Sequence, residues 1–417
     1  MIWYSVYPLG ACGAPIRDVD DPGVHHRLVR LIGWLDHIVA LGANGLALGP
    51  VWASSSHGYD IVDHDAIDPR LGDEADFDEL IAACKERGLR VLLDGVFNHV
   101  SVTHPDVAAA LRDGPDSDAG RLFRHDPGRP DGLARFEGHD GLVEYDHGNP
   151  AVIDRVASTM AHWLRRGADG WRLDAAYRVP KPFWAAVMQR VSAEFPDALT
   201  VAEVLHGDYG GFAHAAQVDS VTQYELWKAI WSSLKDGNPH ELAWALQRHS
   251  GTMAAHDGFL PWTFVGNHDV TRIATQVGAH DALVAMALLA TLPGMPAVYY
   301  GDEFGLTGVK EQRVGGDDAI RPALPANPDE PMPGVAGTIH PDEMFRQYQL
   351  LMGLRRRHMW LQWARLSITE KRHQRLTYRV EPIDETAVRQ HLDVTLDTST
   401  EPTHITVKST ERVEYSV

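Results

Sequence analysis

The chain has 417 residues, of which 44% are hydrophobic and 23% are charged, and its formal net charge is −19 at pH 7. This acidic balance argues against nucleic acids and anionic membrane surfaces as partners, because both attract basic proteins. Two cysteines, Cys12 and Cys84, provide no disulfide framework. The first residues do not resemble a signal peptide, and the sequence has no apolar run of about eighteen residues that would predict a membrane span. We therefore expect a cytoplasmic protein.

Short apolar runs bounded by turn residues predict eight strands along the chain. They lie near Trp3, Leu46, Leu92, Trp171, Val201, Val221, Phe264 and Val298. Amphipathic stretches between them predict helices near 28–41, 76–87, 151–164 and 183–195. Strands that alternate with helices predict an α/β fold with a parallel sheet. Eight such units that close on themselves make a (β/α)8 TIM barrel, whose reactive groups gather at the carboxyl ends of the strands.

The length leaves room for more than a barrel, which needs only about 250 residues. We therefore assign residues 1–99 and 150–358 to the barrel. Residues 100–149, rich in glycine, proline, aspartate and histidine, follow the third strand and predict a short, loop-rich inserted lid. Residues 359–417 alternate apolar and polar side chains and predict a small C-terminal antiparallel β domain.

Four of the predicted strands lead directly into ionisable side chains. DGVFNH contains Asp94 and His99, GWRLDAA contains Arg172 and Asp174, VAEVLHG contains Glu203, and FVGNHD contains His268 and Asp269. Each pair alone could be a structural ion pair or a helix cap. Because unpaired buried charge is costly and barrel strands end on one face, we expect the four segments to form one shared site.

In this order, the four segments resemble the signatures of the α-amylase family of glycoside hydrolases. SSSHGYDIVDHDAIDPRLG around Tyr59 and GMPAVYYGDEFGL around Gly301 extend the resemblance, which covers residues 1–358. Within the family, the sequence most resembles intracellular members that degrade maltooligosaccharides and cyclodextrins. The resemblance implies a retaining enzyme that cleaves α-glucosidic bonds, mainly α-1,4, in small linear or cyclic α-glucans through a covalent glycosyl-enzyme intermediate.

The resemblance also implies the catalytic roles. Asp174 would be the nucleophile, Glu203 the acid/base and Asp269 the third family carboxylate, which stabilises the transition state. Retaining hydrolases hold nucleophile and acid about 5–5.5 Å apart. Arg172 lies two residues before Asp174, so on a strand it shares the same face and can keep that carboxylate ionised.

Further residues are candidates for contact with the sugar. The resemblance implies such a role for Asp94, His99, His268 and Tyr59, the last as an aromatic platform. Trp52, just past a strand end, is a second candidate platform. Arg321, in DDAIRPAL, is either a substrate contact or a solvated loop charge. By contrast, Trp34, Trp163, Trp184 and Trp227 sit at helical spacing and are expected in the core.

No cofactor is required for this chemistry, but the resemblance suggests a site for a structural calcium ion. Asn98 and Glu144 occupy calcium-ligand positions of the family, although calcium needs six to eight oxygen ligands. The expected partner is an α-glucan oligosaccharide, and the oligomeric state stays open. Two alternatives also stay open: transglycosylation on the same substrates, and a catalytically inactive sugar-binding relative.

Overall fold

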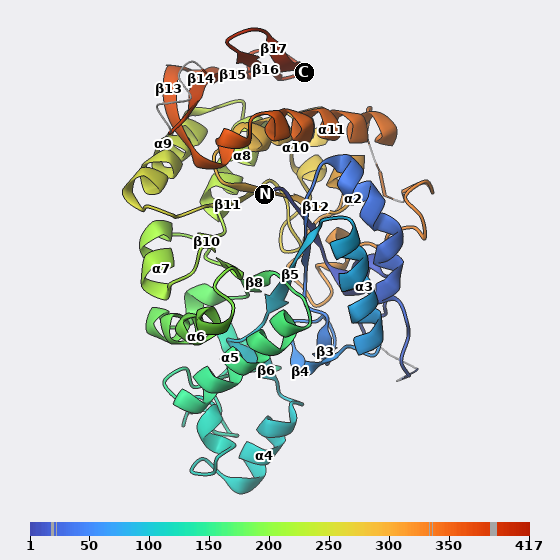
Figure 1. Cartoon of the computed structure of the whole chain (residues 1–417), viewed down its shortest axis with the longest axis vertical. Coiled ribbons are helices and arrows are strands. Elements are labelled where there is room, and N and C mark those ends of the chain that lie inside the picture. The colour runs from blue at the N-terminus through green and yellow to red at the C-terminus, as the bar shows by residue number, and fades with distance from the viewer. Residues whose placement is uncertain (18–20, 22, 333, 336, 384–389) are drawn as a thin grey trace.

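Eight parallel strands form the central sheet of the computed structural model, which describes residues 1–17, 21, 23–332, 334–335, 337–383 and 390–417 (Figure 1). In chain order they are β1 (Trp3–Val6), β2 (Gly45–Leu48), β5 (Arg90–Gly95), β8 (Gly170–Leu173), β9 (Leu199–Ala202), β10 (Ser220–Val221), β11 (Trp262–Phe264) and β12 (Met295–Tyr299). Each contains or adjoins a predicted strand, so the predicted barrel is confirmed.

The barrel is nearly closed. Its strand order is β10-β9-β8-β5-β2-β1-β12-β11, which leaves β10 and β11 as the two edges. A single isolated parallel bridge between Thr222 and Trp262 joins these edges. The closure between β10 and β11 is therefore shorter than the pairing of β9 with β10, which has two residue pairs, and than the other barrel pairings, which have three or four.

Helices pack around the sheet, as the alternating pattern predicts (Figure 1). Their bounds are α1 (Pro8–Ala11), α2 (Leu35–Leu41), α3 (Glu74–Glu86), α4 (Pro105–Asp113), α5 (Pro150–Arg165), α6 (Lys181–Glu194), α7 (Tyr209–Ala216), α8 (Tyr224–Lys235), α9 (His240–Ala255), α10 (Ile273–Thr291) and α11 (Pro341–Arg357). The predicted helix over 28–41 is α-helical only in its second half, because Leu28–Trp34 forms a 3₁₀ helix.

Local sequence explains where these helices begin. Asp73 accepts hydrogen bonds from the first-turn amides of α3, and Asp76 accepts one from the Asp73 amide in return, which makes a capping box. Asn149 caps α5, and Pro150 occupies its first turn, where a missing N–H costs nothing. Each of these two helices then turns an apolar face to the sheet.

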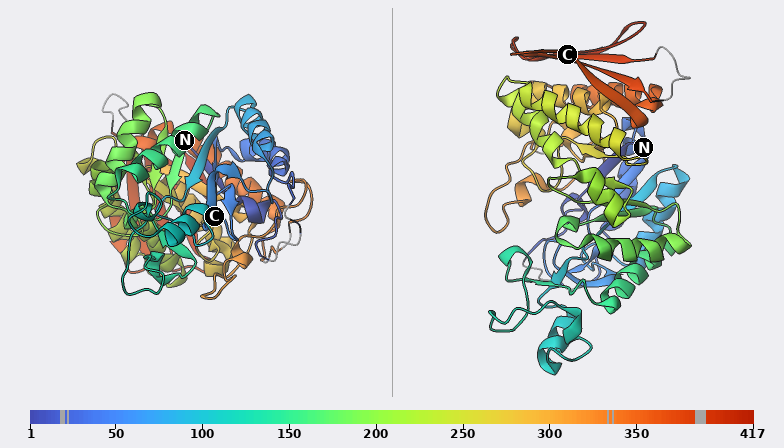
Figure 2. Two further views of the ribbon diagram at one scale, coloured as in Figure 1. Left: turned by 90° about the horizontal axis from the view of Figure 1, so that it is seen from below. Right: turned by 90° about the vertical axis from the view of Figure 1, so that its left-hand side faces the viewer.

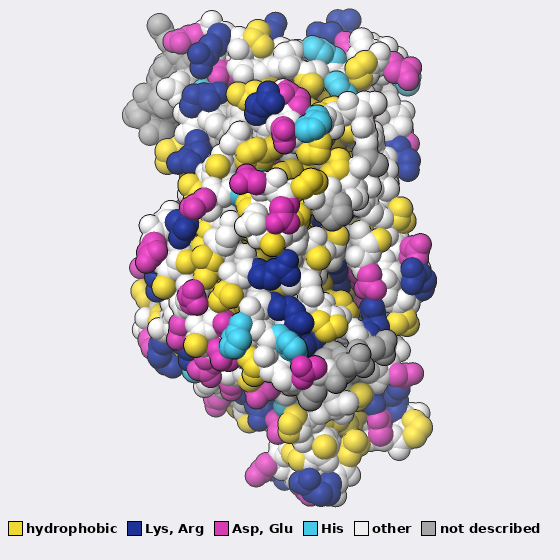
Figure 3. Space-filling view, turned by 90° about the vertical axis from the view of Figure 1, so that its right-hand side faces the viewer, with side chains coloured by type: hydrophobic (Ala, Val, Ile, Leu, Met, Phe, Trp, Pro, Cys, Tyr) yellow, Lys and Arg dark blue, Asp and Glu magenta, His cyan; other side chains and the backbone are white. Residues whose placement is uncertain are grey.

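Helix α10 is long and apolar enough to cross a membrane by length and composition alone. However, 67% of its most apolar window is buried inside the protein, as in the core helix of a globular domain. It packs against α8 and α11. On the face shown in Figure 3, acidic and basic side chains are interspersed, so this face offers mixed charge rather than a basic surface.

Two additions lie at opposite ends of the barrel (Figures 1 and 2). The inserted segment carries α4 and the short pair β6 (His99–Ser101) and β7 (Leu142–Glu144), and the hairpin of β3 (Trp52–Ser54) and β4 (Ile61–Ile67) precedes it. The C-terminal end is one antiparallel sheet of β13 (Ala364–Arg372), β14 (Arg375–Pro382), β15 (Leu392–Asp397), β16 (His404–Ser409) and β17 (Val413–Ser416), which confirms the predicted β domain.

Candidate active site

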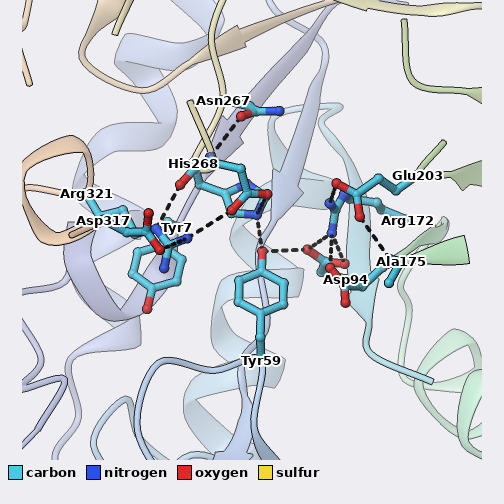
Figure 4. A network of polar contacts seen from close by, with 12 residues as sticks. Tyr7, Tyr59, Asp94, Arg172, Ala175, Glu203, Asn267, His268, Asp317 and Arg321 are labelled. Carbon is cyan, nitrogen blue, oxygen red and sulfur yellow. Dashed lines mark hydrogen bonds and ion pairs between the residues drawn. The ribbon is translucent and has the colours of Figure 1, made fainter. Parts of the chain in front are cut away.

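Neighbouring strands bring the first three segments together at one point (Figure 4). The register of β5 and β8 pairs Asp94 with Arg172, so their side chains leave adjacent strands on the same face. The Arg172 guanidinium donates to both Asp94 oxygens at 2.7 Å, and it lies 3.3 Å from an Asp174 oxygen and 2.9 Å from Glu203 Oε1. One guanidinium thus holds three buried carboxylates.

Two further donors fix the Glu203 carboxylate. The backbone N–H of Ala175 donates to Oε2 at 2.9 Å, and the Tyr224 hydroxyl donates to Oε1 at 2.9 Å. Ala175 has a left-handed backbone (φ 45°), which is strained for a residue with a side chain and turns its amide toward Glu203 directly after Asp174. The Tyr224 hydroxyl accepts in turn from Asn267 at 2.9 Å. Each Glu203 oxygen therefore has a fixed donor.

Burial raises the pKa of Asp174 well above its ordinary value, and the neighbouring Glu203 charge adds to the rise against the opposing effect of Arg172. Burial also raises the pKa of Asp94, although Arg172 and His268 oppose it. Asp94 and Asp174, both bound to the Arg172 guanidinium, therefore take up protons at a higher pH than free aspartates do. A retaining glycosidase needs a proton on the acid and an ionised nucleophile beside it.

Asp269 forms the opposite side of the site with His268 and Arg321. Its two oxygens lie 2.9 Å from His268 Nε2 and 3.1 Å from Arg321 Nη2. Burial alone would raise the pKa of Asp269, but His268 and Arg321 outweigh burial and hold that pKa well below its ordinary value. Asp269 is therefore ionised across the neutral range, and the shift of its pKa is opposite in direction to those of Asp94 and Asp174.

Tyr59 connects the two sides. Its hydroxyl donates to Asp94 Oδ2 at 3.1 Å and also contacts His268 Nε2, and its ring stacks on the His268 ring with centroids 5.2 Å apart. His99 lies behind it, with Nε2 2.9 Å from the Tyr59 carbonyl oxygen and its ring against Phe136. His99 thus positions Tyr59, and sugar contact by either residue stays a prediction.

Trp52 is not available as a platform, which corrects the prediction made from its place after a strand. The side chain is only 1% exposed, and its indole N–H donates to the Asp94 carbonyl oxygen at 2.8 Å. Its ring packs against Trp163 and Trp171 at 4.6 and 5.7 Å. The hairpin of β3 and β4 turns the indole inward, so Trp52 supports the backbone under Asp94 instead.

Arg321 is a buried residue rather than a solvated loop charge, with 8% of its surface exposed. Its Nε donates to the His268 carbonyl oxygen at 2.9 Å, and its guanidinium lies 3.3 Å from Asp317 and 4.6 Å from the Tyr7 ring centre. These contacts occupy the guanidinium with protein groups. A direct contact between Arg321 and substrate stays a prediction.

Cavities mark where a substrate can enter. A cavity of about 50 Å³ reaches into the barrel between Asp94, Arg172, Tyr224 and His268. A larger one of about 530 Å³ lies beside the loop that follows Glu203 and is lined by Tyr177, Arg178, Lys181, Val204, Leu205 and His206. Val204 and Leu205, which directly follow Glu203, line the larger cavity, whereas Tyr224, whose hydroxyl donates to Glu203, lines the smaller one.

The calcium-ligand positions do not fit a calcium ion in this arrangement. Glu144 is buried, and its two oxygens face the guanidinium groups of Arg124 at 2.8 Å and Arg178 at 3.8 Å. The Asn98 amide group contacts His99 Nδ1 at 3.2 Å. The two arginine guanidinium groups already neutralise Glu144, which is the only carboxylate of the pair, and they would repel a divalent cation.

Within the described ranges, one cluster of titratable groups has metal-ligand spacing, formed by His26, Asp73 and Asp76. Both of its carboxylates already cap helix α3. The cluster therefore has a structural explanation, and nothing in it calls for an ion.

Tyr224 and Arg124 were not identified from the sequence. Tyr224 lies three residues after the short strand β10, so like the other site residues it follows the carboxyl end of a barrel strand. Arg124 lies in the inserted segment, where no periodicity shows which loop residue will face Glu144. The first residue could have been found from its position, whereas the second requires the folded lid.

Comparisons with known proteins agree with this geometry. Residues 28–330 match the family model described as "Alpha amylase, catalytic domain". A cyclomaltodextrinase from Bacillus sp is 29% identical over 368 residues, which cover 84% of this chain and 62% of the relative. An intracellular maltogenic amylase from Bacillus subtilis is 30% identical over 337 residues, covering 74% of this chain and 56% of the relative. The chain thus spans about three fifths of the length of these curated relatives.

Among solved structures, a cyclic α-maltosyl-(1→6)-maltose hydrolase from Arthrobacter globiformis, in complex with that cyclic sugar, superposes with a TM-score of 0.81. It is 25% identical, and the match covers 95% of this chain and 90% of the neighbour. The structural match, unlike the sequence matches, therefore extends over almost all of both chains.

Proposed function

Because this chain belongs to the α-amylase family, we propose that it is a retaining glycoside hydrolase acting on α-glucosidic bonds, mainly α-1,4, in small linear or cyclic α-glucan oligosaccharides. The observation that carries the proposal is the single Arg172 guanidinium on Asp94, Asp174 and Glu203, with Asp269 held opposite by His268 and Arg321. Relatives named cyclomaltodextrinase and maltogenic amylase support the substrate class.

The reaction proceeds in two displacements on this geometry. The Asp174 carboxylate attacks the anomeric carbon while Glu203 gives its proton to the glycosidic oxygen, so the C–O bond to the leaving sugar breaks. Glu203, now ionised, then takes a proton from water, whose oxygen attacks the anomeric carbon and releases Asp174. Asp269 stays ionised throughout and stabilises the positive charge that develops on the sugar ring.

Arg172 stabilises negative charge on Asp174 and Glu203 in both steps. It favours the ionised Asp174 before attack, and it balances the charge that Glu203 acquires when the leaving group departs. The donors from Ala175 and Tyr224 hold the Glu203 carboxylate in place while it changes protonation state. No step requires a cofactor, and we propose that the lid functions without calcium.

Transglycosylation is the alternative on the same substrates. The 530 Å³ cavity beside the loop that follows Glu203 supports it, because an acceptor sugar seated there would compete with water for the intermediate. A catalytically inactive sugar-binding role is disfavoured, because all three carboxylates, Arg172 and both histidines are present. Relatives named as intracellular support a cytoplasmic location.

The test is product analysis with a panel of maltotriose, maltoheptaose, a cyclodextrin, a cyclic glucan with α-1,6 links, pullulan, sucrose and trehalose. The anomeric form of the first product is read by NMR, with Glu203→Gln as the control that should lose activity. An α-configured hydrolysis product supports the proposal, and products longer than the input move it to transglycosylation. Full activity in Glu203→Gln would refute the acid/base assignment, and no turnover of any sugar would favour the inactive relative.

A further inference from the structure

A further hollow lies on the outer wall of the barrel, between helices α8 and α9, which are labelled in the upper part of Figure 1. Its volume is about 460 Å³, within the range of small-molecule sites. We call it the α8–α9 groove and define it by Leu205, Tyr224, Trp227 and Trp244, with the ion pairs Lys228–Glu241 and Arg248–Glu225 at its borders.

The walls combine aromatic faces with charged donors and acceptors. Trp244 is 58% exposed, which is unusual for so large an apolar side chain, and the Arg248 guanidinium lies 4.7 Å from its ring centre. Lys228 pairs with Glu241 at 2.5 Å. A sugar ring has apolar C–H faces that stack on indole and a rim of hydroxyls that bond to charged groups. A purely apolar partner would instead have to cover these charges without bonding to them.

The α8–α9 groove borders the active-site cavities and shares lining residues with them. Tyr224 lines both the groove and the inner cavity, and its hydroxyl donates to Glu203. Leu205, two residues after Glu203, lines both the groove and the 530 Å³ cavity. The Gly207 amide donates to Glu225 Oε1 at 3.2 Å, which joins the loop after Glu203 to the groove border. The groove therefore adjoins both the loop that follows Glu203 and the side chain that donates to Glu203.

We propose that the α8–α9 groove binds glucosyl units of an α-glucan chain outside the bond being cleaved. The choice of glucan rests on the proposed function of the neighbouring site. Long substrates gain contacts on Trp244 and Trp227 that short ones lack, so affinity rises with chain length. Because Tyr224 lines both the groove and the inner cavity, a sugar bound in the groove would also restrain the side chain whose hydroxyl donates to Glu203.

Binding is measured in a Glu203→Gln background, which prevents turnover, by calorimetry and tryptophan fluorescence with maltotriose and maltoheptaose. Adding Trp244→Ala should weaken maltoheptaose binding about three- to tenfold, the loss expected for one stacked aromatic contact. The ratio of kcat/KM for maltoheptaose to that for maltotriose should fall by the same factor when Trp244→Ala is placed in the active enzyme. The matched control is Trp363→Ala, since Trp363 is also exposed (42%) but lies beside the C-terminal sheet.

Equal maltoheptaose affinity with and without Trp244→Ala would overturn the proposal. A dimer in light scattering that Trp244→Ala dissociates would also overturn it, because the groove would then be a contact between copies of the chain. The two proposals fail separately. Hydrolysis of glucans with no effect of Trp244→Ala refutes the groove alone, whereas Trp244-dependent glucan binding by a protein that cleaves no glucan refutes the hydrolase alone.

Discussion

Replacing Arg321 by methionine should weaken the site through Asp269 rather than through a lost substrate contact. Arg321 is the only arginine placed on Asp269 among the described residues, and it also donates to the carbonyl oxygen of His268. Methionine keeps much of the apolar stem but removes every donor. Asp269 would keep His268 as a partner and lose its fixed orientation.

The contacts set the size of the effect. Hydrogen bonds to charged groups contribute about 1.5–3 kcal/mol each, and breaking a buried ion pair costs about 3–5 kcal/mol. The Asp269 side chain is 30% exposed, so solvent screens part of this loss. We expect kcat/KM to fall by about 2–3 kcal/mol of transition-state stabilisation, or about 30- to 150-fold.

The pH profile separates this explanation from a direct contact. His268 and Arg321 together hold the pKa of Asp269 well below its usual value despite burial. Without Arg321 that pKa rises, so Asp269 takes up a proton at a higher pH and activity is lost sooner as the pH falls. Asp174 already contributes to the acid limb of kcat/KM in the wild type, so in Arg321→Met this limb should become steeper as Asp269 also takes up a proton there.

The assay is initial-rate hydrolysis of maltoheptaose across pH, with two controls. Arg321→Lys keeps the charge and should restore part of the loss, whereas Asp317→Asn removes a partner of Arg321 on its other side and should change little. A raised KM with an unchanged acid limb would refute the positioning role. It would indicate instead that the guanidinium contacts the sugar.

Four further outcomes are expected. Tyr224→Phe removes the hydroxyl donor to Glu203 and should lower kcat about 10- to 100-fold in steady-state assays, without a matching change in KM; an unchanged kcat would mean that the hydroxyl is dispensable. Burial and the neighbouring acid raise the pKa of Asp174, so the wild-type kcat/KM should already fall with decreasing pH above the ordinary aspartate range of about 3.9; a limb at that value would contradict the raised pKa of Asp174. EDTA should leave the melting temperature unchanged, whereas Arg124→Ala should destabilise the lid by about 1 kcal/mol and speed its proteolysis; melting that depends on added calcium would show that an ion binds after all. Trp52→Ala should cost about 3–5 kcal/mol in denaturant unfolding, because it empties a packed indole site; a loss of glucan affinity without a loss of stability would restore the platform hypothesis.

The sequence predicted the barrel well because each strand is marked by its own residues. Asp94 and Arg172 end neighbouring strands, and strand pairing alone places them opposite each other. The two-residue spacing of Arg172 and Asp174 likewise puts them on one face. Wherever strand geometry decides a position, the residue could be located from sequence alone.

Positions decided by loops could not be located in this way. Trp52 follows a strand end like the site residues, yet the hairpin of β3 and β4 turns it into the core. Trp34, Trp163 and Trp184 are buried in the core as expected, whereas Trp227 is only half-buried, because it packs against core residues and also lines the α8–α9 groove. Helical spacing identifies the face of α8 but not what covers it, because α9 is an additional helix that the alternating pattern does not predict.

The single bridge between Thr222 and Trp262 has a consequence for motion. β10 and β11 share one bridge, against two residue pairs between β9 and β10 and three between β11 and β12, so separating them breaks few amide hydrogen bonds. Within the barrel wall we expect local opening to require the least free energy at this seam, and amide protons there to exchange with deuterated solvent before those of the longer strand pairings. Tyr224, the first residue of α8, lies two residues beyond Thr222. The donor to Glu203 is therefore next to the part of the barrel wall where we expect local opening to be easiest.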